Sequence, residues 1–151
     1  MTRRIALFAV LFAALPAPAQ RASTLVPFHS PVSLDQAEFA PDGALRSADI
    51  SNDSGETITA VQFGCFIRHV DGRITTVVGK NNPIRGGMKP GDRLLFGRQS
   101  MTGNTDDALD LYYFIARVTY EDGTNWNAPL EALRHQIYRK TDTRKRPLTP
   151  A

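Results

Sequence analysis

A long alternation of apolar and polar residues around an Asp-Gly pair is the clearest pattern in the chain. Residues 56–70 read ETITAVQFGCFIRHV and residues 73–78 read RITTVV, with Asp71-Gly72 between them. An Asp-Gly pair between two runs rich in β-branched and aromatic residues predicts a β-hairpin. One face of the first run carries Val61, Phe63, Cys65 and Ile67. We therefore expect that face to point into a core.

Further strands are predicted wherever similar short runs lie between turn residues. These runs are residues 32–39, 44–52, 93–97 and 111–121. Residues 79–92 hold two prolines and four glycines, so a loop is expected there. Residues 99–110 are polar and lack an apolar period, which makes this second loop the first place to look for a binding surface.

The run at residues 111–121 is apolar on both faces over its first half. Alternation places one set of side chains on a shared face: Tyr112, Phe114, Ala116, Val118 and Tyr120. The opposite face begins with Leu111, Tyr113 and Ile115. A strand of this kind is expected to be central, with an additional element covering its second face.

A C-terminal helix is the predicted cover. Apolar residues recur at helical spacing after Pro129, namely Leu130, Leu133, Ile137 and Tyr138. Proline suits the first helical turn, and the cations that follow suit the last turn. We expect one helix over residues 128–140, with its core from Pro129 to Arg139.

Strands separated by turns, without alternating helices, predict an all-β fold. We expect an immunoglobulin-like antiparallel β-sandwich of about seven strands with one C-terminal helix. A small closed barrel is the alternative. The predicted sandwich covers residues 32–127, after an extended lead-in at 20–31.

The N-terminus carries the pattern of a secretory signal peptide. A basic pair at Arg3-Arg4 precedes an apolar run from Ile5 to Leu15 and the small-residue sequence Ala17-Pro18-Ala19. Residues 1–19 are therefore expected to be removed by cleavage after Ala19, which predicts a periplasmic or secreted protein. An uncleaved N-terminal anchor is the alternative. No run is long and apolar enough to predict a transmembrane span.

The net positive charge is concentrated at the C-terminus. The formal charge is +3, and it falls to +1 without Arg3 and Arg4. Residues 139–146 contribute +4, so the body of the domain is slightly acidic. This distribution does not predict nucleic-acid binding. Residues 141–151, which include Arg144, Lys145 and Arg146, are expected to form a disordered basic tail able to contact an anionic envelope surface.

A set of turn motifs resembles a known family. The motifs are Asn52-Asp53-Ser54-Gly55, Asp71-Gly72, Pro90-Gly91-Asp92 and the segment Asp122-Gly123-Thr124-Asn125-Trp126. Together with the strands between them, they resemble small exported bacterial proteins with FxLYD-like extracytoplasmic modules. The chain departs from that pattern at His69-Val70, where a tyrosine–aspartate pair would precede the turn. The resemblance implies an immunoglobulin-like fold and transfers no functional residue.

No combination of residues predicts catalysis, a cofactor or a metal site. His29, His69 and His135 lie in three separate elements without ligand spacing. Asp106, Asp107 and Asp110 lack the glycine and terminal glutamate of an EF-hand loop. Cys65 is the single cysteine and lies on an apolar strand face, where a buried, inert thiol is expected.

Trp126 is the most informative aromatic residue. A three-residue loop before it would place the indole beside Val118 or Tyr120 in the core, whereas a two- or four-residue loop would place it opposite Thr119. An exposed Trp126 near Tyr113 would form a platform for a sugar.

The sequence favours an exported, non-enzymatic binding or interaction module. Its partner is expected to be another envelope protein or a surface, reached through loops or a sheet edge. Candidate partner-binding residues are Tyr113, Trp126, Asp106, Asp107, Arg144, Lys145 and Arg146. A carbohydrate-binding module and a small enzyme are the alternatives.

Overall fold

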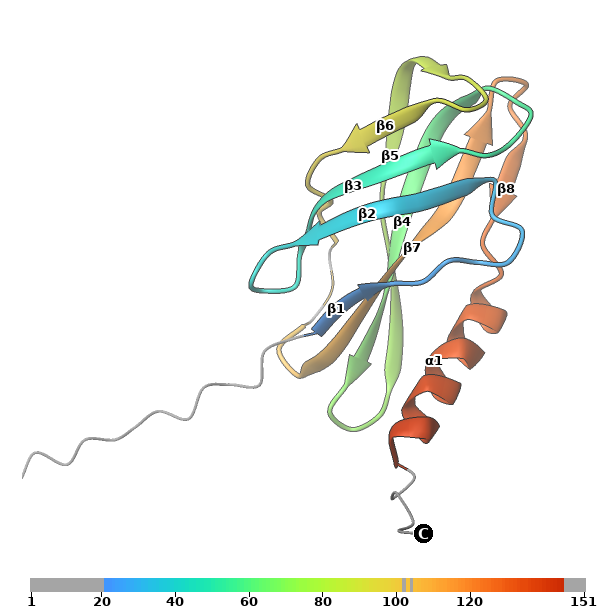
Figure 1. The fold of residues 1–151 in the computed structure, drawn as a ribbon. Coiled ribbons are helices and arrows are strands. Elements are labelled where there is room, and N and C mark those ends of the chain that lie inside the picture. Colours follow the sequence, from blue (N-terminus) through green and yellow to red (C-terminus); the bar gives the residue numbers. More distant parts are fainter. Residues whose placement is uncertain (1–20, 102, 104, 146–151) are drawn as a thin grey trace, which may run out of the picture.

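Two β-sheets and one helix form the described part of a computed structural model, residues 21–101, 103 and 105–145. The larger sheet holds β1 (Arg21–Thr24), β4 (Ile58–His69), β5 (Ile74–Met88), β7 (Ala108–Tyr120) and β8 (Asn125–Asn127). The smaller sheet holds β2 (Val32–Phe39), β3 (Leu45–Asn52) and β6 (Arg93–Phe96). A single helix, α1 (Leu130–Lys145), follows β8 (Figure 1). The predicted signal peptide lies outside the described residues.

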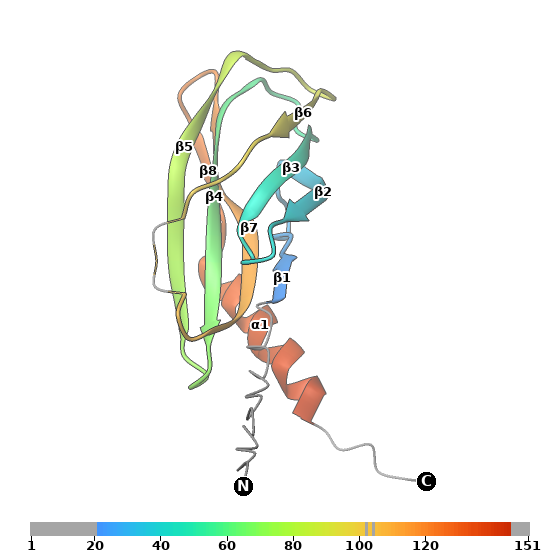
Figure 2. The same cartoon turned by 90° about the vertical axis from the view of Figure 1, so that its left-hand side faces the viewer.

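The sheets pack face to face around the main core. Figure 2 shows them nearly edge on, with β4, β5 and β7 in one layer and β2, β3 and β6 in the other. Val61, Phe63, Cys65 and Ile67 all belong to this core, which confirms the predicted inner face of β4. The described chain is thus mainly β with one C-terminal helix, as predicted.

The returning strand of the hairpin is longer than predicted. β5 runs to Met88, so most of the expected loop at 79–92 is strand, and that prediction was wrong. Its register against β4 shifts twice, once between the Gln62 and Gly64 pairs and once between the Ile58 and Ala60 pairs. β5 is the outer strand of its sheet, where glycine, proline and bulges are tolerated.

A β-bulge in β7 corrects the predicted assignment of its faces. Phe63 pairs with Ile115 while Gln62 pairs with Arg117, so Ala116 is the additional residue. Beyond this bulge the alternation changes face. Val118 therefore lies in the main core with Ile115, rather than on the face shared by Tyr112 and Phe114.

Helix α1 covers the outer face of the large sheet, as predicted from the two-sided apolar pattern of β7. Leu133 and Ile137 pack with Phe66, Tyr112 and Phe114 in a second core. Phe66 and Phe114 stack with ring centroids 4.7 Å apart. The helix ends at Lys145, beyond the predicted end at residue 140.

The outer edge of β7 is shared by the first and last strands. β1 pairs with it in parallel from Asp110 to Tyr113, and β8 pairs with it antiparallel from Arg117 to Thr119. Part of the predicted lead-in is therefore a strand. Across the described residues, no helix has both the length and the apolar character needed to cross a bilayer.

The small sheet covers only part of the large one. In Figure 1, β4, β5 and β7 extend past β2, β3 and β6 towards the end of the molecule that carries the β4–β5 turn. The connection between β6 and β7 lies in this region, and we call its described residues, 97–101, 103 and 105–107, the roof loop.

Candidate functional site

A cavity of about 240 Å³ lies beneath the roof loop. Its apolar lining comes from the inner faces of β4 and β7, with Cys65, Ile67, Leu111 and Tyr113. One wall comes from the turn before β3, with Asp42 and Ala44. The roof loop supplies the rest: Arg98, Gln99, Ser100, Met101, Gly103 and Thr105. The exposed lining is divided about evenly between polar and apolar atoms, with the apolar part on the strands. A concave site with a few placed polar groups is the usual form of a small-molecule site.

Close packing places the roof loop directly on the β4–β5 hairpin. A Cβ atom added to Gly103 would come within 2.8 Å of a Val77 methyl carbon. A Cβ atom added to Gly79 would come within 3.0 Å of the Met101 sulfur. The two glycines therefore let the loop approach β5 closely.

Hydrogen bonds fix the start of the roof loop. The Gln99 side chain is buried, and its amide oxygen accepts a hydrogen bond of 3.0 Å from Asn82. The Gln99 backbone N–H donates to the carbonyl of Leu45 at 3.1 Å. These bonds attach the loop to both sheets.

A buried histidine fixes the end of the roof loop. The Nδ1 atom of His69 lies 2.6 Å from Oδ1 of Asp107, and the Asp107 carbonyl accepts a 3.0 Å bond from the Val70 N–H. The hydrogen bond with His69 lowers the pKa of the Asp107 carboxyl. Both ends of the loop are thus attached to strands.

His69 also contacts a hydroxyl group. Asp107, His69 and Thr75 are therefore linked in the order found in a catalytic triad, with an acid, a base and a hydroxyl nucleophile. The Nε2 atom of His69 lies 2.8 Å from Oγ1 of Thr75. However, the His69 side chain is only 3% exposed, and Thr75 does not line the cavity. The arrangement therefore holds the hairpin and the loop together and presents no nucleophile to the cavity.

A buried carboxylate joins three strands beside this site. Asp110 accepts a 2.7 Å bond from Nε of Arg68 and a 2.9 Å contact from Nε of Arg21. Its side chain is 5% exposed, whereas that of Arg21 is 60% exposed. This ion cluster fixes the short β1 strand to β7 and β4.

Burial suppresses ionisation in the apolar lining. It raises the pKa of the Cys65 thiol to about 12, and it raises the pKa of the Tyr113 phenol to about 12. Because the thiolate is the reactive form, Cys65 is an inert part of the wall at neutral pH.

The alternative of an exposed aromatic platform is excluded, because Tyr113 is buried. Only 4% of Tyr113 is exposed, and its hydroxyl donates a 2.9 Å hydrogen bond to the Gly43 carbonyl. Tyr113 is therefore not part of an exposed platform, and it lines the cavity instead.

Trp126 lies apart from Tyr113. It pairs with Val118 on β8 and is partly buried between the two cores. The Tyr120 N–H donates to the Thr124 carbonyl at 2.9 Å, which closes the three-residue loop that predicts this position.

The remaining candidate residues are dispersed. Asp106 and Asp107 lie on the roof loop, where both are exposed. Arg144 and Lys145 lie in the last turn of α1, and Arg146 lies outside the described residues. Within residues 21–101, 103 and 105–145, no three His, Cys, Asp or Glu side chains are grouped as a metal site.

Sequence reasoning missed the His69–Asp107 contact and the cavity itself. His69 and Asp107 are far apart in the chain, and no spacing rule connects them. The polar, aperiodic run at residues 99–110 was the one usable signal, and it identified the loop but not what lies under it.

Comparisons with known proteins assign no function. No family model matches the chain, and no curated protein matches it. The chain is similar to a hypothetical protein from Peptoclostridium difficile 630 of known structure, with 9% sequence identity and a TM-score of 0.41. The match covers 72% of this chain and 91% of that one.

Proposed function

We propose that this protein is an exported, non-enzymatic binding module that holds a small ligand with an apolar part and a polar part under the roof loop. The main support for this proposal is the cavity, which lies between apolar strand residues and a loop that is attached at both ends. The fold we propose for it is an immunoglobulin-like sandwich, supported by its two facing sheets. Export is supported by the leader pattern of residues 1–19.

The side chains around the cavity support binding rather than catalysis. The thiol of Cys65 stays protonated because burial raises its pKa, and the Tyr113 hydroxyl is already hydrogen-bonded to Gly43. The polar groups lie mostly on the roof loop and the turn before β3, with Arg98 and Asp42 among them. A ligand with an apolar body and one polar end would fit this distribution.

Methionine methyl signals give a direct test of ligand binding. The sequence contains three methionines, of which Met101 lines the cavity and Met88 is buried away from it. The protein with labelled methionine methyls is titrated with butanoate, hexanoate and octanoate, and with the matching alcohols and amines. We expect a saturable shift of the Met101 signal and a constant Met88 signal.

A blocked cavity provides the matched control. Ser100→Trp adds bulk from the roof loop without changing either core, and it should abolish the Met101 shift. Arg46→Trp adds the same side chain at an exposed position on β3 and should leave the titration unchanged. If none of the probes moves the Met101 signal, or if Met88 moves with it, the cavity is not a ligand site.

Export has its own measurement. Expression of the full gene followed by cell fractionation and intact-mass analysis should give a chain that begins at Gln20 outside the cytoplasm. A full-length chain retained in the membrane fraction would favour an uncleaved anchor instead.

A further inference from the structure

A second surface is formed by the segment after β1 and one flank of α1. Val26 and Phe28 line one side of a groove of about 520 Å³, and Ala132, His135, Gln136 and Arg139 line the other. We propose that this surface, which we call the linker–helix face, binds the headgroup region of an anionic membrane. This proposal does not depend on the cavity under the roof loop.

Phe28 is held outward by a fixed turn. Along the segment, Leu25 and Pro27 are buried, while Val26 is 56% exposed and Phe28 is 75% exposed. The Leu25 N–H donates to the Tyr113 carbonyl at 2.8 Å, and the Ser30 N–H donates to the Pro27 carbonyl at 3.3 Å. The buried residues therefore anchor a backbone that presents the two apolar side chains to solvent.

The turn itself has an unusual backbone conformation. His29 has φ of 57°, and it is the one non-glycine residue of the described chain with positive φ. This left-handed conformation is uncommon for a residue with a side chain. It closes the turn that places Phe28 at its tip, where the ring has the largest exposed fraction among the exposed large apolar residues.

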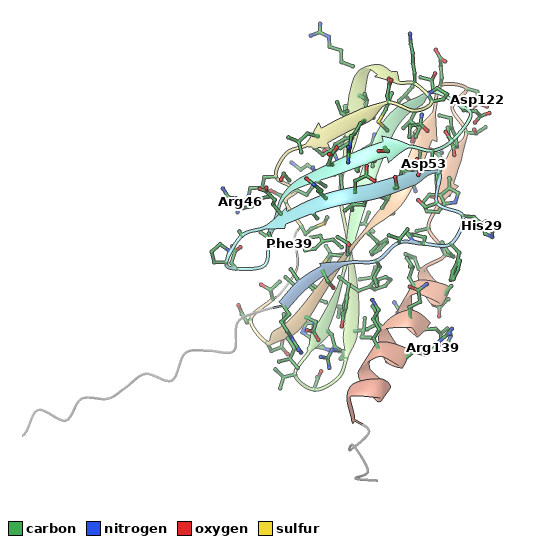
Figure 3. The ribbon with its side chains drawn as sticks, in the orientation of Figure 1. His29, Phe39, Arg46, Asp53, Asp122 and Arg139 are labelled. Atoms are coloured by element: carbon green, nitrogen blue, oxygen red, sulfur yellow. The ribbon has the colours of Figure 1, made fainter. Side chains whose placement is uncertain are left out.

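The charge of the linker–helix face is complementary to an anionic surface. Its charged or chargeable lining residues are His135 and Arg139, and no carboxylate of the described residues lines the groove. In Figure 3, His29 on the linker and Arg139 on the helix point to the same side of the molecule.

The chemistry of the face suits a lipid surface. A projecting aromatic ring beside cations is the arrangement found where proteins lie on membranes, because the ring enters the headgroup boundary and the cations meet phosphate. The tip position of Phe28 suits insertion into a soft surface.

Vesicle co-sedimentation tests the proposal. The full chain and the chain beginning at Gln20 are compared, because the apolar leader could itself bind lipid. Vesicles of phosphatidylcholine alone are compared with vesicles that also contain phosphatidylglycerol, at low and high salt. We expect binding to the anionic vesicles that weakens with added salt, and little binding to phosphatidylcholine.

Matched variants locate the surface. Phe28→Ser and Arg139→Glu should each reduce binding several-fold. Phe28→Trp should retain binding, and on vesicles its emission should shift to the blue by more than that of the unaltered protein, which contains only Trp126. Leu95→Ser removes an apolar side chain that is 68% exposed on β6, and Arg46→Glu reverses a charge on β3; both should bind as the unaltered protein does. Thermal melts verify that each variant is folded.

Several outcomes would overturn the proposal. These are equal loss in the control variants, no loss in Phe28→Ser and Arg139→Glu, or equal binding to both vesicle types. Tighter binding of an acidic peptide than of anionic vesicles, lost in the same two variants, would assign the face to a peptide instead.

Discussion

Nδ1 of His69 lies 2.6 Å from Oδ1 of Asp107, and this contact joins the end of β4 to the end of the roof loop. Removing it should loosen the loop while leaving the two cores intact. We expect His69→Gln to speed amide hydrogen exchange in residues 99–107 several-fold, with little change in β3 or α1. His135→Gln changes an exposed histidine on the helix and serves as the control. Unchanged exchange in the roof loop would show that the Gln99 contacts alone hold it.

Losing Asp110 and losing Arg21 should have very different effects on the stability of the Asp110 cluster. Asp110→Ala leaves the Arg68 guanidinium, whose side chain is 18% exposed, without its carboxylate. Breaking a buried pair in this way costs about 3–5 kcal/mol of unfolding free energy. Arg21→Ala removes a mostly exposed partner and should cost about 0–1 kcal/mol. Urea denaturation measures both, and equal losses would contradict the assignment of Arg68 as the main partner.

Gly64 is required by the stacking of Phe114 over the sheet. A Cβ atom at Gly64 would lie 2.5 Å from Cζ of Phe114, and that ring is fully buried under α1. Gly64→Ala should therefore destabilise the protein by about 1–3 kcal/mol through overpacking. Gly55→Ala, where nothing lies within 4 Å, should be nearly neutral.

A double variant separates the steric explanation from a backbone effect. Replacing Phe114 by leucine costs stability by itself, but it also removes the ring atoms that the methyl group added by Gly64→Ala would meet. The penalty of Gly64→Ala should then be smaller in the Phe114→Leu background than in the unaltered chain. Strictly additive penalties would show that the ring is not the cause.

The Tyr113 phenol should make stability depend on alkaline pH. Its pKa is raised to about 12 in the folded chain by burial, against an ordinary value of about 10 in an unfolded one. The unfolded chain therefore loses the proton first, so the stability contributed below pH 10 is lost as the pH rises towards 12. Tyr113→Phe should remove this part of the slope.

The same variant has a second effect at neutral pH. Loss of the hydrogen bond to the Gly43 carbonyl should cost about 0.5–1.5 kcal/mol of unfolding free energy. Denaturation at pH 8 and at several higher values measures both effects. Cys65 has a raised pKa as well, so Cys65→Ala is the control that separates the two contributions.

The sequence correctly predicted those strands and helix ends that are set by neighbouring turn residues. The Asp71-Gly72 hairpin, the strands β2 and β3 and the start of α1 all follow from turn residues and apolar period. The extension of β5 to Met88 does not, because an outer strand tolerates glycines and prolines that would end a central one. The bulge at Ala116 is likewise set by pairing with β4.

The candidate site was only partly predictable for a related reason. Residues 99–110 were identified as a polar loop, but the cavity arises where that loop crosses strands that the small sheet leaves uncovered. Tyr113 faces the main core together with Leu111 and Ile115, as the alternation of apolar residues indicated. It is therefore not available for an exposed aromatic platform. The linker–helix face could not be predicted from the sequence. Val26 and Phe28 alternate with the buried residues Leu25 and Pro27, and the sequence does not indicate which pair is exposed.

The parallel pairing of β1 with β7 constrains how the chain can be assembled. Arg21 lies opposite Asp110, so the first strand has no place to pair until almost the whole domain has been made. The entropic cost of closing so long a loop slows folding, which leaves the newly made chain extended for longer. Under the export proposed above, β1 would enter a secretion channel before its partner strand could pair with it.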